Sequence, residues 1–299
     1  MDTLNDTIQY KLKYLNNDPI NLSIKVKTPS LNREGRGGSL FLMISDKAII
    51  SPKAKIGNNV TIYPFVYIED DVEIGDDCVI YPYVSVMNGT RMGRGNKIHQ
   101  NTVLGAIPQD FSYRGDATIL VIGDENIIRE NVVINRATFK DGETRIGNRN
   151  FIMEGVHLSH DTHVGDGCVF GYGSKVAGDT EFGNGVILSS NVIVNPQVRI
   201  GNGVMLSSGC RVSKDVPPYI VANDNPVRYG GLNAQVLTAH GVDEKIQKHI
   251  ANAYRLIFHG QTSVFDAVIQ VKEQVPDSLE ISNIVNFINN TKLGIIGKM

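Results

Sequence analysis

From Ile146 to Val176 the chain reads IGNRNF-IMEGVH-LSHDTH-VGDGCV-FGYGSK-V, and each group of six begins with a bulky apolar residue. A helix repeats about every 3.6 residues and a flat strand about every 2, so neither element by itself explains a period of six. A fixed short period is typical of a solenoid, in which coils of similar sequence stack on one another. This stretch therefore predicts a repeat protein.

The same frame runs from Ile50 to Val212, with interruptions at about 105–121 and 135–145. Glycine often follows the first residue of a repeat, and the residue four positions after the first is usually small. We expect three repeats to form one triangular coil, with the first residue inside, the small residue in a corner, and glycine or asparagine in the tight turn. Loops that leave a regular solenoid commonly carry binding groups, so the two interruptions are candidate site loops.

The repeats resemble the left-handed parallel β-helix of the hexapeptide-repeat acyltransferases, and the expected left hand comes from that resemblance. The run Asp215-Val216-Pro217-Pro218-Tyr219 ends the repeats, because proline cannot donate to a strand ladder. From about 242 the apolar residues recur with helical period, and two capping boxes indicate further helices, at Ser263 with Asp266 and at Asp277 with Glu280. The predicted fold class is an all-β solenoid, a left-handed parallel β-helix of hexapeptide repeats, with a C-terminal α-helical domain.

Three segments follow from these patterns. Residues 1–42 lack the repeat and are expected to be an N-terminal extension, either a real arm, ordered or not, or the product of an over-long reading frame. The β-helix is expected over 43–220 and the helical domain over 221–299.

Composition narrows the function classes. The formal net charge is −2 and no basic cluster occurs, which argues against nucleic acid as a partner. No apolar run reaches the length of a membrane span, and the N-terminus lacks the apolar region of a signal peptide, so we expect a cytoplasmic protein without an integral membrane segment. Cys78, Cys168 and Cys210 all occupy the small position of the repeat, which predicts buried small side chains rather than metal or disulfide chemistry.

A cluster of histidines is the strongest candidate for chemistry. The run 157–163 contains His157, His160 and His163, and Asp161 follows His160. Because Leu158 points inward in the repeat frame, His160 and Asp161 should lie on the outer surface near a corner, where the pair could act as a general base and its orienting carboxylate. The alternatives are solvated surface histidines, or a zinc site shared between chains as in the γ-type carbonic anhydrases of this fold; within one chain the three histidines should not converge.

Several runs resemble the UDP-N-acetylglucosamine O-acyltransferases, the family that begins lipid A synthesis. They cover about 43–299 in the same order, and they are Gln109-Asp110, Ile128-Arg129-Glu130, Gly155 to Gly165, Asp215 to Tyr219, and Asn252 to Ile257. The resemblance implies direct transfer of a 3-hydroxyacyl chain from acyl carrier protein to the 3-hydroxyl of UDP-N-acetylglucosamine, with neither a metal nor another cofactor. It also implies a homotrimer with sites between adjacent prisms.

The resemblance assigns roles to individual residues. His160 would be the general base, Asp161 would orient it, and the backbone N–H of Ser190, where the family typically has glycine, would stabilise the oxyanion. Substrate binding would fall on Gln109, Asp110, His157, Gly178, Asn233, Gln235 and His240, the last three toward the nucleotide. Ser208 stands at the position that limits acyl length, and its bulk relative to glycine would shorten the acyl groove.

The chain also departs from the family pattern. Histidine is usual where this chain has Asn135, Asp179 and Asn195, lysine at Ser112, glutamine at Pro196, and arginine at Ala239. These changes touch substrate binding and leave the His160–Asp161 pair intact. Three further readings therefore stay open: a paralogue that acylates another nucleotide sugar such as a 3-amino sugar, the sister acyltransferase of the pathway that acylates an amine, and a non-catalytic hexapeptide-repeat scaffold.

Overall fold

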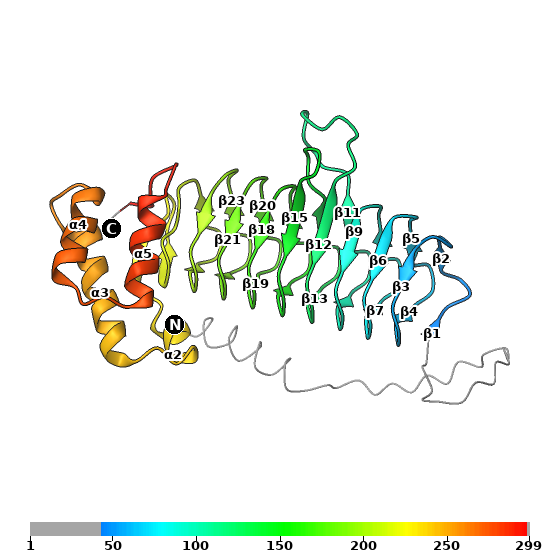
Figure 1. Cartoon of the computed structure of the whole chain (residues 1–299), viewed down its shortest axis with the longest axis horizontal. Helices are drawn as coiled ribbons and strands as arrows, with labels where there is room; N and C mark the ends of the chain where they lie inside the picture. Colours follow the sequence, from blue (N-terminus) through cyan, green and yellow to red (C-terminus); the bar gives the residue numbers. More distant parts are fainter. Residues whose placement is uncertain (1–42, 298–299) are drawn as a thin grey trace. The chain divides into compact units, whose positions relative to one another are not determined.

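The computed structural model describes residues 43–297, and the expected N-terminal extension 1–42 lies outside the described residues. Most strands are two residues long and pair in parallel with the strand one coil later, as in Thr61↔Val79 and Tyr67↔Ser85. Where no insertion intervenes, the paired residues are 18 apart, so three repeats make one coil. The predicted parallel β-helix is confirmed (Figure 1).

Among residues 43–297 the strands form three sheets, named A, B and C here. Sheet A contains β1 (Met43–Ile44), β4 (Thr61–Ile62), β7 (Val79–Ile80), β10 (Lys97–Ile98), β13 (Ile127–Ile128), β16 (Phe151–Ile152), β19 (Val169–Phe170), β22 (Ile187–Leu188), β25 (Met205–Leu206), β27 (Ile220–Asn223) and β28 (Arg228–Leu232). Sheet B contains β2 (Ile49–Ile50), β5 (Tyr67–Ile68), β8 (Ser85–Val86), β11 (Val103–Ala106), β14 (Val133–Asn135), β17 (His157–Leu158), β20 (Lys175–Val176), β23 (Ile193–Val194) and β26 (Arg211–Val212). Sheet C contains β3 (Lys55–Ile56), β6 (Val72–Ile74), β9 (Thr90–Met92), β12 (Ile119–Ile122), β15 (Glu143–Ile146), β18 (His163–Val164), β21 (Glu181–Phe182) and β24 (Arg199–Ile200).

The chain passes through the sheets in the order A, B, C, which defines three corners. The A–B corner follows a strand of sheet A, the B–C corner follows a strand of sheet B, and the C–A corner follows a strand of sheet C. Because a coil is 18 residues long, residues 18 apart stack at the same corner of neighbouring coils. This register decides which of the candidate site residues can meet within one chain.

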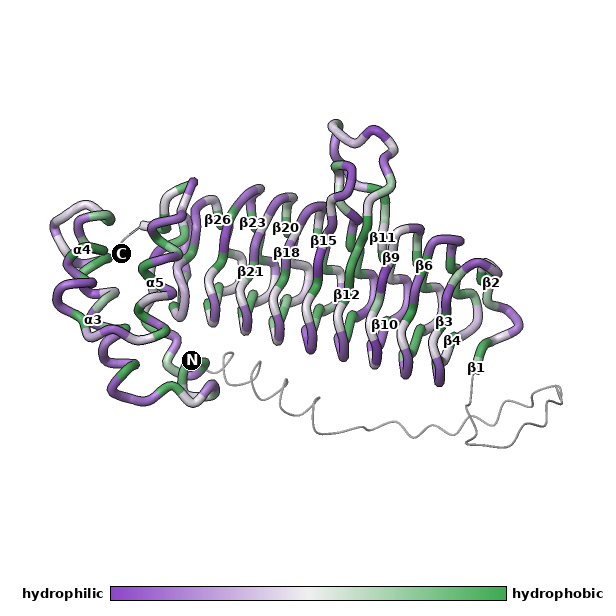
Figure 2. Tube along the Cα trace, in the orientation of Figure 1, coloured by the Kyte–Doolittle hydropathy of each residue, from purple (hydrophilic) through white to green (hydrophobic). Residues whose placement is uncertain are grey.

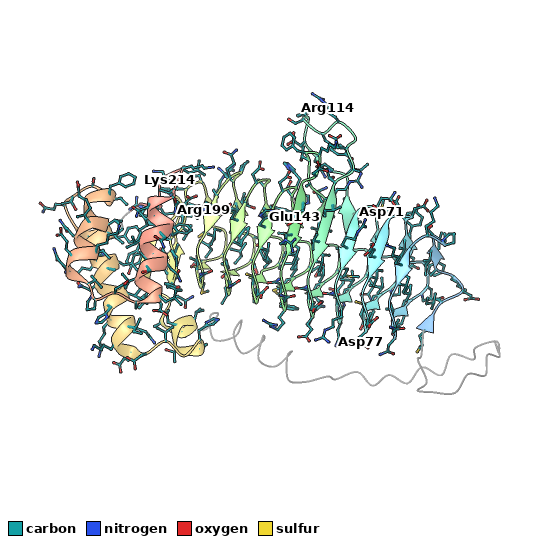
Figure 3. All side chains as sticks on the ribbon, viewed as in Figure 1. Asp71, Asp77, Arg114, Glu143, Arg199 and Lys214 are labelled. Atoms are coloured by element: carbon teal, nitrogen blue, oxygen red, sulfur yellow. The ribbon has the colours of Figure 1, made fainter. Side chains whose placement is uncertain are left out.

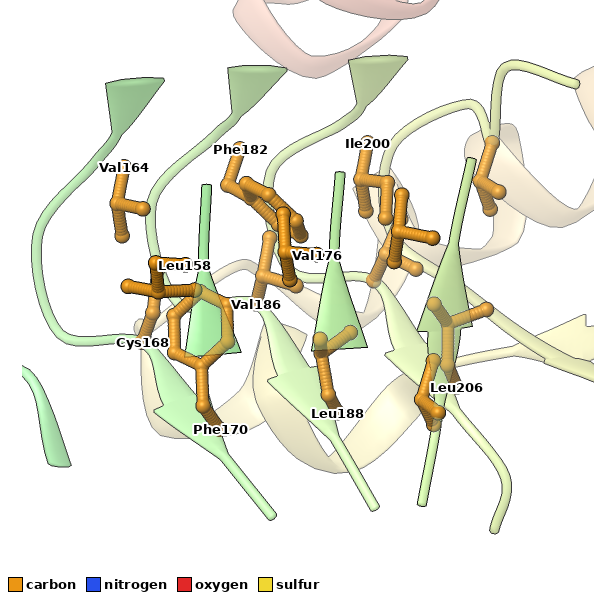
Figure 4. Close-up of a cluster of buried hydrophobic side chains, with 14 of the residues drawn as sticks. Leu158, Val164, Cys168, Phe170, Val176, Phe182, Val186, Leu188, Ile200 and Leu206 are labelled. Carbon is orange, nitrogen blue, oxygen red and sulfur yellow. The ribbon is translucent and has the colours of Figure 1, made fainter. Parts of the chain in front are cut away.

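The first residues of the repeats from Ile62 to Val212 are buried inside the prism, as the sequence predicted, whereas Ile50 and Ile56 are only half-buried. Phe170 is fully buried and packs edge-on against Phe182, with ring centroids 5.2 Å apart, and aliphatic side chains of neighbouring coils surround the two rings (Figure 4). The colouring in Figure 2 shows the resulting alternation along the tube, with hydrophobic and hydrophilic residues following each other at short intervals. The three cysteines are also buried and unbridged, as expected.

We expect Phe170→Ala to lower the free energy of unfolding by about 3–5 kcal/mol, because the thin core leaves an unfilled cavity beside Phe182. Urea unfolding followed by far-UV circular dichroism measures the change. The control is Tyr172→Ala in the same coil, whose side chain is 51% exposed and whose loss should cost less than about 0.5 kcal/mol. Equal losses in the two variants would contradict the assignment of Phe170 to the core.

The turn differs from the expectation in one respect. The residue with positive φ is the third after the first residue of the repeat, and at several corners it is neither glycine nor asparagine: Phe65 has φ 64°, Tyr83 has φ 64° and Arg149 has φ 52°. The glycine that directly follows the first residue serves another purpose. A Cβ on Gly147 would lie 2.7 Å from the carbonyl oxygen of Gly165, so glycine there lets neighbouring coils approach closely.

Some small corner positions hold buried asparagines instead of apolar residues. Along the C–A corner Asn126 donates its backbone N–H to Asn96 Oδ1 at 2.9 Å, and Asn150 donates in the same way to Asn126 Oδ1 at 2.8 Å. The Cys168 N–H then donates to Asn150 Oδ1 at 2.7 Å. The ladder satisfies backbone groups that the turns would otherwise leave buried and unpaired.

Four helices follow sheet A within the described residues: α2 (Ala234–Ala239), α3 (Glu244–His259), α4 (Val264–Gln274) and α5 (Leu279–Asn289). Ser263 is confirmed as the N-cap of α4, since its side chain accepts from the N–H of Asp266, whereas the cap of α5 is Ser278, one residue after the predicted Asp277, because the Ser278 side chain accepts from the N–H of Ile281. Helix α2 was not predicted, since its six residues are too few to show a period. In residues 43–297 none of the helices is both long and apolar enough to cross a membrane.

The helices are joined to the last coils by polar contacts. Tyr254 of α3 is fully buried and donates its hydroxyl to the carbonyl oxygen of Pro218. Asp215, also fully buried, accepts from the Arg199 N–H at 2.9 Å and from the Thr291 hydroxyl at 2.7 Å. The run at 215–219 that ends the repeats therefore also supplies the attachment for the helices.

Candidate active site

His160 and Asp161 lie side by side at the B–C corner, directly after β17. His160 Nδ1 lies 2.8 Å from Asp161 Oδ2, and the two side chains are 12% and 16% exposed. Asp161 has φ 56°, a backbone conformation that brings its carboxylate back onto the neighbouring imidazole. An Nδ1–H···carboxylate bond leaves Nε2 as the nitrogen able to accept a proton.

Asp161 is itself held by the second interruption of the repeats. The backbone N–H of Thr138 donates to its carboxylate at 3.1 Å, and Thr144 Oγ1 accepts from the Asp161 N–H at 2.8 Å. Burial opposes the charged form of Asp161, but the hydrogen bonds from His160 and from Thr138 outweigh it and lower the pKa of Asp161. The aspartate therefore stays ionised beside the imidazole.

Asp110 approaches the other nitrogen of His160 from the first interruption. Its Oδ2 lies 3.6 Å from His160 Nε2, and its Oδ1 accepts from the Ser112 N–H at 2.7 Å. The hydrogen bond to Asp161 raises the pKa of His160 against the opposing effect of burial, and the charges of Asp161, Asp110 and Asp179 raise it further. Gln109, next to Asp110, is exposed.

Gly178 lies one coil beyond His160 at the same corner and forms the surface on which the imidazole rests. A Cβ on Gly178 would lie 2.4 Å from His160 Cε1, so no larger residue fits without moving the ring. At the C–A corner the corresponding amide donates to a side chain one coil later, as Asn148 does to Asp166 Oδ1 at 2.7 Å. The residue one coil beyond Gly178 is Pro196, whose side chain offers no acceptor.

Two further polar residues border the pair. His157 points outward from sheet B, and burial, followed by the charges of Lys175 and His160, lowers its pKa. Asp179 stacks above Asp161, and its N–H donates to the His160 carbonyl at 3.2 Å. Desolvation and then the charge of Asp161 raise the pKa of Asp179. Carboxylates therefore surround His160 on more than one side.

These groups open into a groove of about 1080 Å³ that runs from the first interruption toward the C-terminal segment. Its lining includes Asp110, Asp161, Asp179, Gln197, Arg199 and Lys292. Glu143 and Arg199 are labelled in Figure 3 and mark how far the lining extends along sheet C. Three carboxylates that surround His160, those of Asp110, Asp161 and Asp179, thus line this groove, whereas His160 itself is not one of its lining residues.

The remaining candidates lie at other corners of the same chain. Ser190 and Ser208 are at the A–B corner, after β22 and β25. Asn233 caps α2 and donates to the Gly203 carbonyl at 3.0 Å, at the C–A corner, and the His240 ring packs on Gly185 of that corner. Gln235 is exposed on α2. One chain thus gathers Asp110, His160, Asp161, Gly178 and Asp179, and it leaves the other groups on different edges of the prism.

The residues that depart from the family pattern have different surroundings. Asn135 is buried and donates to the Ile107 carbonyl at 2.7 Å, so it joins the two interruptions. Ser112, Pro196 and Ala239 are exposed, and Asn195 is half-buried.

Sequence reasoning missed the groups that hold the site together. The Thr138 amide and the Thr144 hydroxyl act on Asp161 from the second interruption, and neither belongs to a recognisable motif. The contact between Gly178 and His160 was available from the 18-residue coil, since positions 160 and 178 are one coil apart.

Comparisons with known proteins agree with this geometry. Residues 215–296 match the family described as UDP N-acetylglucosamine O-acyltransferase, domain 2, and residues 47–84, 71–106 and 143–178 match the bacterial transferase hexapeptide repeat. The chain is 38% identical over 257 residues to an acyl-(acyl-carrier-protein)–UDP-N-acetylglucosamine O-acyltransferase of Syntrophobacter fumaroxidans, covering 85% of this chain and 100% of that protein. It is 46% identical over 253 residues to the protein of the same name from a Sulfurihydrogenibium species, covering 84% and 93%.

A solved structure gives the same result in three dimensions. The crystal structure of a UDP-N-acetylglucosamine acyltransferase from Bacteroides fragilis aligns with a TM-score of 0.84 at 46% identity, covering 85% of this chain and 100% of that one. With whole relatives matched at these identities, the chain belongs to the acyl-(acyl-carrier-protein)–UDP-N-acetylglucosamine O-acyltransferase family of hexapeptide-repeat proteins.

Proposed function

We propose that this protein transfers a 3-hydroxyacyl chain from acyl carrier protein to the 3-hydroxyl of UDP-N-acetylglucosamine, the first step of lipid A synthesis. The observation that carries the proposal is the arrangement of His160: Asp161 holds Nδ1 at 2.8 Å, while Nε2 faces Asp110 at the groove. Relatives matched over 93% and 100% of their length are named acyl-(acyl-carrier-protein)–UDP-N-acetylglucosamine O-acyltransferases, which supports the proposal.

His160 and Asp161 can account for both proton transfers of this reaction. His160 Nε2 takes the proton of the sugar hydroxyl while the hydroxyl oxygen attacks the thioester carbon and forms a C–O bond. The tetrahedral intermediate then collapses, the C–S bond breaks, and the imidazolium returns the proton to the departing thiolate. Asp161 stabilises the imidazolium between these two steps.

The oxyanion of the intermediate needs a donor close to His160. We assign this role to the Gly178 N–H, because Gly178 packs on the imidazole and faces a proline one coil later. Ser190 lies at the A–B corner of its own chain, so its amide could serve only from a neighbouring copy. The resemblance to the family favoured Ser190, and the position of Gly178 now makes it the better candidate.

The distribution of residues over three corners supports a homotrimer. Gln109, Asp110 and His157 border the reacting group, whereas Asn233, Gln235 and His240 lie at the C–A corner. Each side of a coil holds six residues, about 20 Å at the rise of a strand, so these groups cannot all contact one sugar nucleotide from a single chain. A neighbouring prism that brings its C–A corner to the B–C corner completes the site.

The decisive experiment measures acyl transfer from a panel of 3-hydroxyacyl carrier proteins to UDP-N-acetylglucosamine and to its 3-amino analogue. Ester product from the first acceptor supports the proposal and gives the acyl length. Product from the 3-amino analogue alone would show that the acceptor is the amino sugar and that the reaction is still acyl transfer. No product together with no saturable binding of either UDP-sugar would favour a non-catalytic scaffold.

The roles of His160 and Asp161 can be tested through the pH dependence of kcat/KM. His160 must be neutral to act as a base, and Asp161 raises its pKa, so wild-type kcat/KM should fall as the pH drops through that raised value. Asp161→Asn removes the raising charge, so the acid limb of the profile should move to lower pH while the maximal kcat falls at least about tenfold. An unmoved acid limb would show that His160 is not the group that titrates.

Ser208→Gly should shift the preferred donor toward longer acyl chains, because Ser208 is exposed at the A–B corner and its side chain would shorten a groove along that corner. The carrier-protein panel measures the chain-length profile. Ser207→Gly, at the half-buried neighbouring position, is the matched control. A profile unchanged in the Ser208 variant would place the end of the acyl groove elsewhere.

A further inference from the structure

Asp110 belongs to a loop that leaves the prism, so something must fix its position against His160. The loop joins β11 to β12 and protrudes from the coils (Figure 1), and Arg114 marks its outer part (Figure 3). Phe111, next to Asp110, is fully exposed, so the loop has little packing of its own there. Loops with few buried contacts are the first parts of a protein to move.

Tyr113 ties Asp110 to a local turn. The Tyr113 N–H donates to the Asp110 carbonyl at 3.1 Å, and the Ser112 N–H donates to the Asp110 carboxylate at 2.7 Å. The Tyr113 hydroxyl donates to the Asp116 carbonyl at 3.0 Å, which closes the turn on its far side. A group that holds the Tyr113 side chain in place therefore also restrains the position of Asp110.

Arg136 of the second interruption is that group. Its Nη2 donates to the Tyr113 hydroxyl at 2.9 Å, and its guanidinium carbon lies 5.9 Å from the centre of the Tyr113 ring. Its Nη1 donates to the Asn88 carbonyl at 3.0 Å, and its backbone N–H donates to the Ala106 carbonyl at 3.0 Å. For residues 43–297 the structure records no carboxylate within salt-bridge distance of Arg136, so its hydrogen bonds go to the loop and to the coil beneath it.

The same short segment also acts on Asp161. Thr138, two residues after Arg136, holds the Asp161 carboxylate through its backbone N–H. The second interruption therefore contacts both carboxylates that flank His160, one through Arg136 and Tyr113 and the other through Thr138.

We propose that Arg136 and Tyr113 form a clamp that positions Asp110 against His160 Nε2. Neither residue contacts the reacting atoms, so both are positioning residues for the pair. The catalytic consequence rests on the proposed acyl transfer, whereas the effect of the clamp on His160 itself does not.

The clamp has a measurable effect on the titration of His160. The ionisable groups that face His160 are Asp161 of the same turn, Asp110 of the first interruption, Asp179 of the next coil, and His157 of β17. Asp110 is the member of this set that stands on the protruding loop. If the clamp is released and Asp110 moves away, His160 loses one stabilising negative charge and its pKa falls.

The test uses the full chain and two measurements. Histidine-selective isotope labelling with NMR follows the titration of His160, assigned by its loss in His160→Ala, and steady-state kinetics gives kcat/KM against pH. Tyr113→Phe removes one hydroxyl and keeps the ring, and Arg136→Lys keeps the charge and loses the planar fork. Both should move the His160 titration to lower pH, in the direction given by Asp110→Asn, and lower kcat/KM about tenfold to a hundredfold.

Double variants distinguish a loss of the positioning of Asp110 from a general loosening of its loop. In the Asp110→Asn background, Tyr113→Phe should produce no further shift, because the charge that the clamp positions is already absent. Arg114→Ala, in the exposed outer part of the same loop, is the control and should leave the titration unchanged.

Two outcomes would overturn the clamp. One is a His160 titration that is the same in Tyr113→Phe, Arg136→Lys and wild type while Asp110→Asn shifts it; the other is an additional full shift in the combined variant. If wild-type protein transfers no acyl group, the proposed function fails by itself and the NMR titration still decides the clamp.

Discussion

His160→Ala is expected to lower kcat for acyl transfer by about 10²–10⁴-fold, the usual contribution of a positioned general base. The imidazole is the acceptor for the hydroxyl proton and later the donor to the thiolate, and the other groups at the corner cannot replace it. The hydrogen bonds from His160 and Thr138 lower the pKa of Asp161, so this carboxylate is a far weaker base than an imidazole. Single-turnover kinetics with saturating substrates measures the chemical step directly.

The fold should survive this change, because the His160 side chain lies outside the prism core. A circular dichroism spectrum and a Tm close to those of wild type are therefore part of the expected result. His249→Ala, in helix α3, is the matched control and should retain wild-type kcat. Undiminished kcat in His160→Ala would remove the imidazole from the mechanism.

Gly178→Ala is expected to lower kcat by about 10²–10³-fold without a comparable loss of stability. The added methyl would lie 2.4 Å from His160 Cε1, and the ring must turn away from Asp161 to make room. The methyl also crowds the amide to which we assign the oxyanion, and the loss of one such donor costs about 10²–10³-fold in other enzymes. The backbone of Gly178 does not have positive φ, so alanine itself introduces no strain there.

Gly171→Ala is expected to show the opposite pattern, in which thermal stability is lost. Its added methyl would lie 2.5 Å from the carbonyl carbon of Ser189, which is backbone of the next coil and cannot turn away. We expect a clear fall in Tm for Gly171→Ala and little change for Gly178→Ala, measured by thermal denaturation beside kcat. If Gly178→Ala lost Tm and activity together, as a clash with the coil would cause, the glycine would be structural rather than catalytic.

Much of the site could be predicted because the repeat fixes the direction of each side chain. Leu158 begins its repeat and is fully buried, which places His160 outside the core, as the frame predicted. The pairing of His160 with Asp161 is a local contact between neighbours in sequence. For the other candidates within the coils, the corner also follows from the 18-residue period, and this register would have separated Ser190 from His160.

Contacts that involve the interruptions could not be predicted in this way. Asp110 meets His160, and Thr138 meets Asp161, because two loops of irregular length fold back on the B–C corner. Irregular segments carry no period, so their side chains have no frame from which direction can be read. The cap of α5 moved from Asp277 to Ser278 for a related reason, since either residue type can accept from the first turn.

The sequence by itself determined the coiled architecture, the buried row of bulky residues and the outward position of His160 and Asp161. A period of six repeated over stacked coils permits only one inward face. Only the tertiary structure decided that Asp110 stands 3.6 Å from His160, that Gly178 lies under the imidazole, and that Arg136 holds the loop. The physical reason is that the repeat specifies neighbours one coil apart, whereas the loops are placed by hydrogen bonds between segments that share no register.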